Sequence, residues 1–148
     1  MSIKDLITEL DGNLVVDNVK KAENCIYINC HTQLSEHKCP YCGHSSSRVH
    51  SKYIRTITDL PIQNNKVKLI LSVHKYFCEN DKCNFTTFSE SFDFVETRAV
   101  RTKRFDNYIK NIGLRGNAMD AVRTLKEMGT NISGNTIINI VKKNRTTN

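Results

Sequence analysis

The sequence predicts an α+β fold, in which a β-rich part is followed by a helical last third. Between residues 38 and 94, apolar and polar residues alternate with a period of two, which is typical of strands. From Arg98 onward the apolar residues recur every three or four positions, which is typical of helices. Four of the six cysteines form two pairs within the β-patterned part. We therefore expect three parts, 1–37, 38–97 and 98–148.

The first part, residues 1–37, is expected to form a short helix and two short strands. Ser2 precedes Asp5 by three positions, as in a capping box, and apolar residues follow on one helical face up to Gly12. Segments 14–19 and 24–31 are expected to be extended. The acidic N-terminus does not resemble a secretory signal, and no stretch approaches the roughly 18 apolar residues of a membrane span. We expect a cytoplasmic protein whose thiols stay reduced.

The middle part, residues 38–97, is expected to be a small β-rich module. Lys52–Thr58 is predicted to be a strand that ends at a breaker, Asp59-Leu60-Pro61. Lys66–Phe77 is the clearest strand, and its alternation places five apolar residues on one face: Val67, Leu69, Leu71, Val73 and Phe77. Residues 85–88 are expected to add a short closing strand.

Two cysteine pairs lie at the ends of these strands. Cys39 and Cys42 are followed by Gly43, which permits the tight turn of a metal-binding knuckle, and Cys78 and Cys83 form the second pair. Thirty-five residues separate the pairs, enough for the strands between them. Four thiolates on two such turns can close a tetrahedral site, which Zn²⁺ prefers and which leaves no position open for water. We therefore predict a zinc ribbon with one structural Zn²⁺ on Cys39, Cys42, Cys78 and Cys83.

Other roles are conceivable for the cysteines and histidines, but the sequence favours them less. A redox role for Cys39 and Cys42 requires a helix start after the motif, which the pattern lacks, and iron accepts the same four-sulfur geometry. Cys25 and Cys30 lie five apart on an expected strand, so they point to opposite faces and are interpreted as buried or half-buried free cysteines. The five histidines show no ligand spacing with one another and are interpreted as surface or phosphate-facing residues.

The last part, residues 98–148, is expected to contain three helices. A first apolar stripe, from Phe105 to Ile112, ends near Gly113. A second helix is expected from Asn117 to Gly129, and Ser133 caps a third, whose inward residues are Ile137, Ile140 and Val141. A small residue where two helices cross and an apolar residue in the turn complete the pattern of a helix-turn-helix over residues 117–143; these are Ala121 and Ile132.

Positive charge is concentrated in the same part of the chain. Residues 98–148 carry eleven basic and three acidic side chains, a net charge of +8, whereas residues 1–38 carry −2 and residues 39–97 carry +1. This excess favours a polyanion, and we predict double-stranded DNA, with a solvated basic face on a three-helix bundle as the alternative. Amides suit base edges and cations suit phosphates. The predicted DNA contacts are Arg98, Arg101, Lys103, Arg104, Asn135, Thr136, Asn139, Lys142, Lys143 and Arg145.

One series of short motifs runs through most of the chain. It consists of Cys39-Pro40-Tyr41-Cys42-Gly43, Tyr53-Ile54-Arg55-Thr56-Ile57-Thr58-Asp59-Leu60-Pro61, Tyr76-Phe77-Cys78 with Cys83, Phe88-Ser89-Glu90, and then the basic helix-turn-helix. In this order the motifs resemble the N-terminal region of the ISL-three insertion-sequence transposases. The resemblance implies that the four cysteines are zinc ligands and that the helix-turn-helix recognises the terminal inverted repeats of an element.

The resembled family continues into an RNase-H-like catalytic domain with three carboxylates and divalent metal. Here the last third holds only Asp106, Asp120 and Glu127 as acids, all on short expected helices, which cannot assemble a two-metal site. We therefore expect a non-enzymatic, zinc-stabilised, sequence-specific DNA-binding protein corresponding to a truncated transposase, associated with the nucleoid when bound. A stand-alone DNA-binding regulator and an interaction module that no longer binds DNA are the alternatives. A second copy of the chain is a further expected partner, whereas a membrane and a small-molecule substrate are not expected.

Overall fold

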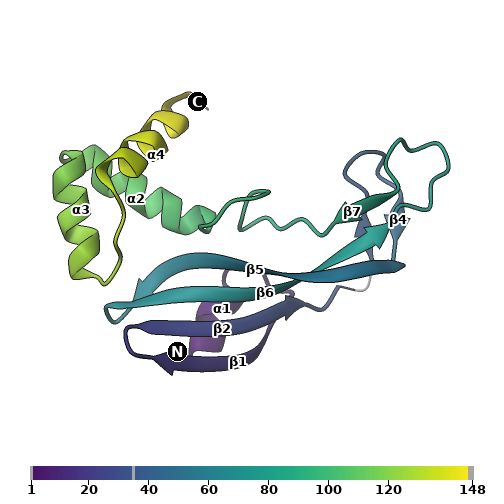
Figure 1. The fold of residues 1–148 in the computed structure, drawn as a ribbon, viewed down its shortest axis with the longest axis horizontal. Coiled ribbons are helices and arrows are strands. Elements are labelled where there is room, and N and C mark those ends of the chain that lie inside the picture. Colours follow the sequence, from purple (N-terminus) through teal and green to yellow (C-terminus); the bar gives the residue numbers. More distant parts are fainter. Residues whose placement is uncertain (1, 35, 147–148) are drawn as a thin grey trace. The chain divides into compact units, whose positions relative to one another are not determined.

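The computed structural model describes residues 2–34 and 36–146, and it describes residues 144–146 by their backbone alone. As the sequence predicts, the fold is of the α+β type, with a sheet-rich part and four helices among the described residues (Figure 1). The elements are, in chain order, α1 (Ile3–Thr8), β1 (Leu14–Ala22), β2 (Cys25–Thr32), β3 (His37–Lys38), β4 (Ser45–Ser46), β5 (Val49–Ile62), β6 (Asn65–Phe77), β7 (Thr87–Ser89), α2 (Lys103–Arg115), α3 (Ala118–Glu127) and α4 (Gly134–Thr146).

Two compact units divide the chain. The ribbon unit consists of Met1–Val19, Ile28–Thr56 and Leu69–Asp93. The helical unit consists of Lys20–Tyr27, Ile57–Lys68 and Phe94–Asn148. The turns of the β1–β2 and β5–β6 hairpins therefore belong to the helical unit. The division into 1–37, 38–97 and 98–148 stays a prediction.

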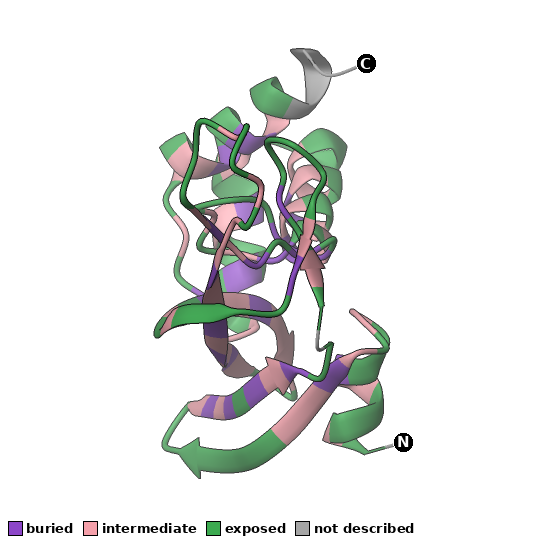
Figure 2. Cartoon of the chain, turned by 90° about the vertical axis from the view of Figure 1, so that its right-hand side faces the viewer, coloured by how far each residue is buried: buried purple, intermediate pink, exposed green. Residues whose placement is uncertain are grey.

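Strand pairing follows a simple order. Within the part of the chain that the structure describes, one sheet has the order β1-β2-β6-β5 with β7 paired to β6, and a second, two-stranded sheet joins β3 and β4. β7 runs antiparallel to β6 with Phe88 opposite Tyr76, and β3 runs antiparallel to β4 with His37 opposite Ser46. Buried positions alternate with more exposed ones along β2 and β6, as the period of two predicts (Figure 2).

The N-terminal elements agree with the sequence analysis. The hydroxyl of Ser2 accepts the backbone N–H of Asp5 at 3.3 Å, and the Asp5 carboxylate accepts the backbone N–H of Ser2 at 2.8 Å, which completes the capping box. The Ser2 backbone N–H lowers the pKa of Asp5 from its ordinary value. The two expected extended segments are β1 and β2.

Strand β5 corrects one expectation. Asp59-Leu60-Pro61 does not break the strand, because β5 continues through it to Ile62 and the chain turns at Gln63 and Asn64, which have φ angles of 49° and 65°. β5 is the last strand in the sheet order, so a proline that lacks an N–H donor is tolerated there. Two successive residues with positive φ are typical of a tight hairpin turn.

The burial pattern of strand β6 changes near its end. Val67, Leu69, Leu71 and Val73 are fully buried on one face, as predicted, but the next buried residue is Tyr76. That Phe77 continues the same face stays a prediction, and Tyr76 packs with Cys39 and Phe88 in a small apolar cluster. Phe77 is half-buried, and the guanidinium of Arg48 lies 4.6 Å from its ring centroid.

The three C-terminal helices share one apolar cluster. Its buried members are Phe105, Ile109, Ala121, Leu125, Ile137 and Ile140, and partly buried residues, including Leu60 from β5 and Ile132 from the turn, pack against them. The predicted caps are present, since Asn117 accepts the N–H of Asp120 at 2.9 Å and Ser133 that of Thr136 at 3.2 Å. Within residues 2–34 and 36–146, none of the helices is both long enough and apolar enough to cross a bilayer.

Two glycines mark close approaches in this unit. The sequence analysis expected α2 to end near Gly113, but the helix continues to Arg115. A Cβ atom at Gly113 would lie 3.0 Å from Cγ2 of Val141 and 3.1 Å from Cγ2 of Ile137, so the absent side chain lets α4 approach α2. Gly129 has a φ of 88°, as its predicted position after the second helix requires, and a Cβ atom there would lie 2.2 Å from the carbonyl oxygen of Asn64.

Candidate metal centre and nucleic-acid interface

The four predicted metal ligands converge at one point of the ribbon unit. The Sγ atoms of Cys39, Cys42, Cys78 and Cys83 all lie within 4.8 Å of one another. The Sγ–Sγ distance is 4.0 Å between Cys39 and Cys83 and 3.6 Å between Cys42 and Cys78. A tetrahedral Zn²⁺ with bonds of about 2.3 Å to sulfur requires ligands about 3.8 Å apart. The four sulfurs therefore fit a zinc ion with little rearrangement.

Local backbone turns place these sulfurs. In the first knuckle, the N–H of Gly43 donates to the carbonyl of Cys39 at 2.8 Å, and the N–H of Cys39 donates to the carbonyl of His44 at 2.9 Å. Gly43 has a φ of 79°, which confirms the reason for expecting a glycine there. In the second knuckle, the N–H of Cys83 donates to the carbonyl of Asn80 at 3.0 Å. Each pair thus lies on its own hydrogen-bonded turn.

The electrostatics of the knuckles favour bound thiolates. The backbone N–H of His44, and after it the side chain of Asn80, lowers the pKa of the Cys42 thiol to about 6. At Cys78 the Asn80 N–H also lowers the pKa, but burial and the neighbouring cysteines raise it to about 12 in sum. The thiolate of Cys42 therefore forms readily, whereas the raised pKa values of Cys78 and Cys83 mean that these two thiols resist deprotonation beside it. A divalent cation removes that resistance because it binds all four sulfurs as thiolates.

A buried polar network lies in the same unit, and the sequence analysis missed it. Glu90 has a fully buried carboxylate, which accepts the Thr32 hydroxyl at 2.6 Å and the backbone N–H of His74 at 2.8 Å, and also pairs with His74 Nδ1 at 2.7 Å. His37 Nε2 lies 3.7 Å from the same carboxylate. The interpretation of all histidines as surface residues was therefore wrong for His37 and His74. No spacing in the sequence indicates this network, since its members are brought together by strand pairing.

Cys25 and Cys30 do not belong to the four-sulfur cluster. Cys25 is half-buried and Cys30 is buried, and both are free thiols. Burial raises the pKa of Cys30 to about 12, so this thiol stays protonated and packs as an apolar side chain.

Two of the four basic residues before and at the start of α2 are paired with acids of the helical unit. Arg101 Nε donates to Asp106 at 2.6 Å, and Arg104 forms an ion pair with Asp59, which is 2% exposed. The Thr102 hydroxyl also donates to Asp59 at 2.7 Å. Arg104 is therefore tied to a buried carboxylate and fixes the start of α2. Of the predicted residues in this segment, Arg98 and Lys103 are exposed.

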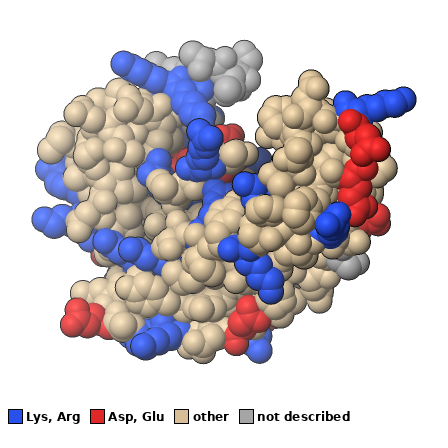
Figure 3. Space-filling model, turned by 45° about the vertical axis from the view of Figure 1, so that its right-hand side comes forward, with Lys and Arg blue, Asp and Glu red and all other residues tan. Residues whose placement is uncertain are grey.

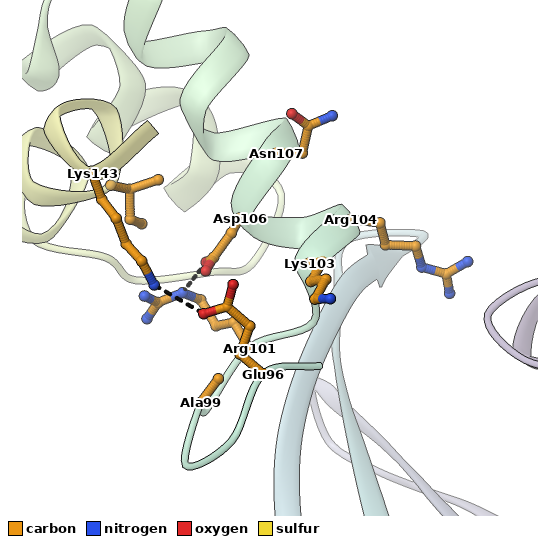
Figure 4. Close-up of a pocket in the computed structure, with 9 residues that line it drawn as sticks. Glu96, Ala99, Arg101, Lys103, Arg104, Asp106, Asn107 and Lys143 are labelled. Atoms are coloured by element: carbon orange, nitrogen blue, oxygen red, sulfur yellow. Dashed lines mark hydrogen bonds and ion pairs between the residues drawn. The ribbon is translucent and has the colours of Figure 1, made fainter. Parts of the chain in front are cut away.

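A cavity of about 450 Å³ opens beside these side chains. It is lined by Glu96, Ala99, Arg101, Lys103, Arg104, Asp106, Asn107, Ile140 and Lys143 (Figure 4). Two ion pairs cross it, between Lys143 and Glu96 at 3.0 Å and between Arg101 and Asp106. Figure 3 likewise shows that acidic side chains interrupt the lysines and arginines on the face drawn. Much of the local positive charge is thus already neutralised.

The predicted DNA contacts on α4 also differ in whether their side chains are already paired within the protein. Asn135, Asn139 and Lys142 are exposed, and no side-chain interaction within the described residues involves them. Thr136, in contrast, shares a hydrogen bond with the hydroxyl of Ser133 at 2.9 Å. Lys143 is paired with Glu96. The side chain of Arg145 lies outside the described residues.

A comparison with protein families identifies the ribbon. Residues 35–83 match the family described as the zinc-finger of transposase IS204/IS1001/IS1096/IS1165. The match spans both cysteine pairs, and searches of curated proteins and of solved structures found no match. The predicted resemblance is confirmed for this segment, which is a zinc ribbon of the ISL-three type. Together with the sulfur geometry, it establishes one structural Zn²⁺ on Cys39, Cys42, Cys78 and Cys83.

Proposed function

We propose that the chain binds duplex DNA through its helical unit and that zinc stabilises its ribbon. The observation that carries this proposal is the outward face of α4, where two amides and a lysine are exposed and their side chains form no hydrogen bond or ion pair within the described residues. The net charge of +8 over residues 98–148 supports a polyanionic partner. The match of the ribbon to a transposase family makes DNA the polyanion to test first.

We propose further that α3 and α4 form a helix-turn-helix. The turn between them begins at Gly129 with its positive φ and ends at Ser133, which caps α4. Ile132 packs from this turn onto the apolar cluster, and Ala121 is fully buried in it. These contacts support α4 as the recognition helix, since such motifs hold that helix against its partner and leave the opposite face for the major groove.

Ion pairing narrows the set of proposed phosphate contacts. Arg98, Lys103 and Lys142 are exposed cations outside the ion pairs described above, so they can meet phosphates without first breaking a pair. Arg101 and Lys143 would have to leave Asp106 and Glu96. Arg104 remains with buried Asp59, because removing one partner of a buried pair is costly. Arg145 stays a proposed contact.

A titration against duplex DNA at several salt concentrations tests the proposal. Binding should weaken steeply as salt rises, and Lys142→Ala should reduce the slope of log K against log salt by about one unit. Lys52→Ala serves as the matched control, because Lys52 is an exposed lysine on β5 within the ribbon unit, and should leave the slope unchanged. Weak binding that does not depend on salt would exclude DNA as the partner.

The resemblance to transposases also suggests the target. We propose terminal inverted repeats as the recognised duplexes, bound by more than one copy of the chain. Footprinting on an element end, with light scattering of the complex, tests both points. Protection spread evenly over the fragment would contradict recognition of a terminal repeat.

A second candidate function is protein binding at the zinc knuckles. Tyr41 and Phe85 stack there with ring centroids 3.6 Å apart, although they are 56% and 48% exposed. Exposed Glu79 and Asp81 in the second knuckle disfavour a DNA backbone at this surface. If this is the main function, Tyr41→Ser with Phe85→Ser should abolish partner capture, and Lys142→Ala should have no effect.

A further inference from the structure

The outward face of α4 combines two amide side chains, one apolar side chain and one lysine. Asn135, Ile138, Asn139 and Lys142 follow the spacing i, i+3, i+4 and i+7, so they form one stripe along the helix. All four are exposed, whereas Ile137 and Ile140 on the other side are 1% and 7% exposed. We name Asn135, Ile138, Asn139 and Lys142 the α4 stripe.

The two amides of the α4 stripe are available to a partner. Within the described residues, no hydrogen bond holds the side chain of Asn135 or Asn139. Thr136, which lies between them in sequence, is held by the hydroxyl of Ser133. Along Gly134–Lys143, the part of α4 whose side chains the structure describes, the free amide donors and acceptors therefore lie on one side.

Ile138 is an apolar residue in the middle of this polar stripe. It is 41% exposed, and Met119 at the start of α3 is 63% exposed. The sulfur of Met119 lies 4.0 Å from the position of a Cβ atom on Gly134, which is one turn before Ile138. Two exposed apolar side chains thus lie near the first turns of α4, where recognition helices contact bases.

We propose that the α4 stripe recognises A·T base pairs in the major groove, with Ile138 against a thymine methyl group. This inference rests on the proposed function. An amide pairs with adenine through two hydrogen bonds, and an apolar side chain contacts the C5-methyl of thymine. Guanine is recognised chiefly by arginine or lysine, and the stripe has no arginine. Its lysine stands seven residues after Asn135, about 10 Å further along the helix, where it suits a phosphate.

The first experiment selects binding sites from a randomised duplex pool with the zinc-loaded full chain. The retained duplexes should share a segment rich in A·T pairs. If no duplex is retained at low salt, the proposed function fails as well. If the shared segment is rich in G·C pairs, DNA binding stands and this inference is overturned.

The second experiment removes only the methyl groups. Uracil replaces thymine in the selected duplex, and because uracil lacks just the C5-methyl, loss of one buried contact should weaken binding by about fourfold. Ile138→Ala should bind the thymine and uracil duplexes equally. Leu114→Ala is the matched control, since Leu114 is an aliphatic residue that is 48% exposed on α2, and it should keep the fourfold ratio.

Two outcomes would overturn the assignment of Ile138. One is a wild-type chain that binds both duplexes equally. The other is an Ile138→Ala chain that still discriminates between them, because another residue would then contact the methyl group. Ile138→Val, which keeps a branched side chain, should retain part of the ratio. Thermal unfolding of each variant confirms that it is folded, as expected for a change at an exposed position.

Discussion

The zinc-binding end of the ribbon unit and the helical unit are stabilised by different means. Around the four sulfurs, the apolar cluster has Cys39, Tyr76 and Phe88 as its buried members, with Cys78 and Cys83 packed against it. In the helical unit, the cluster has six buried residues, of which Phe105, Ile109, Ala121 and Leu125 are completely buried. The zinc end of the ribbon thus depends on a metal, whereas the helices depend on apolar burial. The zinc-binding end of the ribbon and the helical unit should therefore respond to different perturbations.

Loss of a zinc ligand should have the largest effect. Cys78→Ser removes one of four thiolates, and because structural zinc contributes on the order of 10 kcal/mol of binding free energy, the knuckles should lose their order. Metal analysis should find less than one zinc per chain, and amide exchange should rise in residues 38–48 and 78–89. Cys25→Ser is the control and should keep its zinc. If Cys78→Ser retains its zinc and its protection from amide exchange, the zinc end of the ribbon does not depend on the metal.

Truncation of the helical core should come next. Leu125 is fully buried, so Leu125→Ala should lower the free energy of unfolding by about 2–5 kcal/mol. Urea unfolding followed by helical circular dichroism measures this change. Zinc content should remain one per chain, which sharpens the contrast with the cysteine variant. If Leu125→Ala also loses zinc, the stability of the zinc site depends on the helical core.

Substitution of Gly129 should cost somewhat less. Gly129→Ala places a Cβ atom at positive φ and against the carbonyl of Asn64, and such strain costs about 1–3 kcal/mol. Gly12→Ala is the control, because no atom lies within 4 Å of a Cβ there, and it should change stability by less than about 0.5 kcal/mol. Equal melting temperatures for the two variants would contradict the close approach.

The smallest effect concerns the ion pair between Glu96 and Lys143. The hydrogen bond from Lys143 lowers the pKa of Glu96 below its ordinary value of 4.5. A lowered pKa means that the pair stabilises the fold above this value and loses that contribution as pH falls through the lowered pKa. Lys143→Met should raise the Glu96 pKa toward 4.5, as measured by carboxyl ¹³C shifts during a pH titration. An unchanged pKa would show that the ion pair with Lys143 does not form in solution.

Features with a local signal were predicted correctly from the sequence. The metal knuckles follow from the cysteine spacing and Gly43, and the helix caps at Ser2, Asn117 and Ser133 follow from residues a few positions apart. The turn glycine at position 129 belongs to the same class, since its φ is set by the helix that it ends.

Features that depend on distant residues were not predicted. β5 passes through Pro61 because it lies at an edge of the sheet, which its own sequence does not reveal. Glu90 meets Thr32 only after strands far apart in the chain have paired. The positive charge of Arg104 predicted a DNA contact. Its carboxylate partner, Asp59, lies 45 residues earlier, so the sequence near Arg104 does not reveal that the charge is paired. Charge composition therefore overstated the number of free cations.

The ion pair between Asp59 and Arg104 has an evolutionary consequence for the Asp59-Leu60-Pro61 phrase, which is the name used below for this three-residue motif. Asp59 accepts hydrogen bonds from Thr102 and Arg104, and Leu60 packs onto the helical cluster, so the phrase supports the helices although it lies beside the ribbon in sequence. Its selection should thus depend on the helices that it supports. Among related chains, exchange of the aspartate should coincide with exchange of the arginine, and a lineage that loses the helices should let the phrase drift while its four cysteines persist.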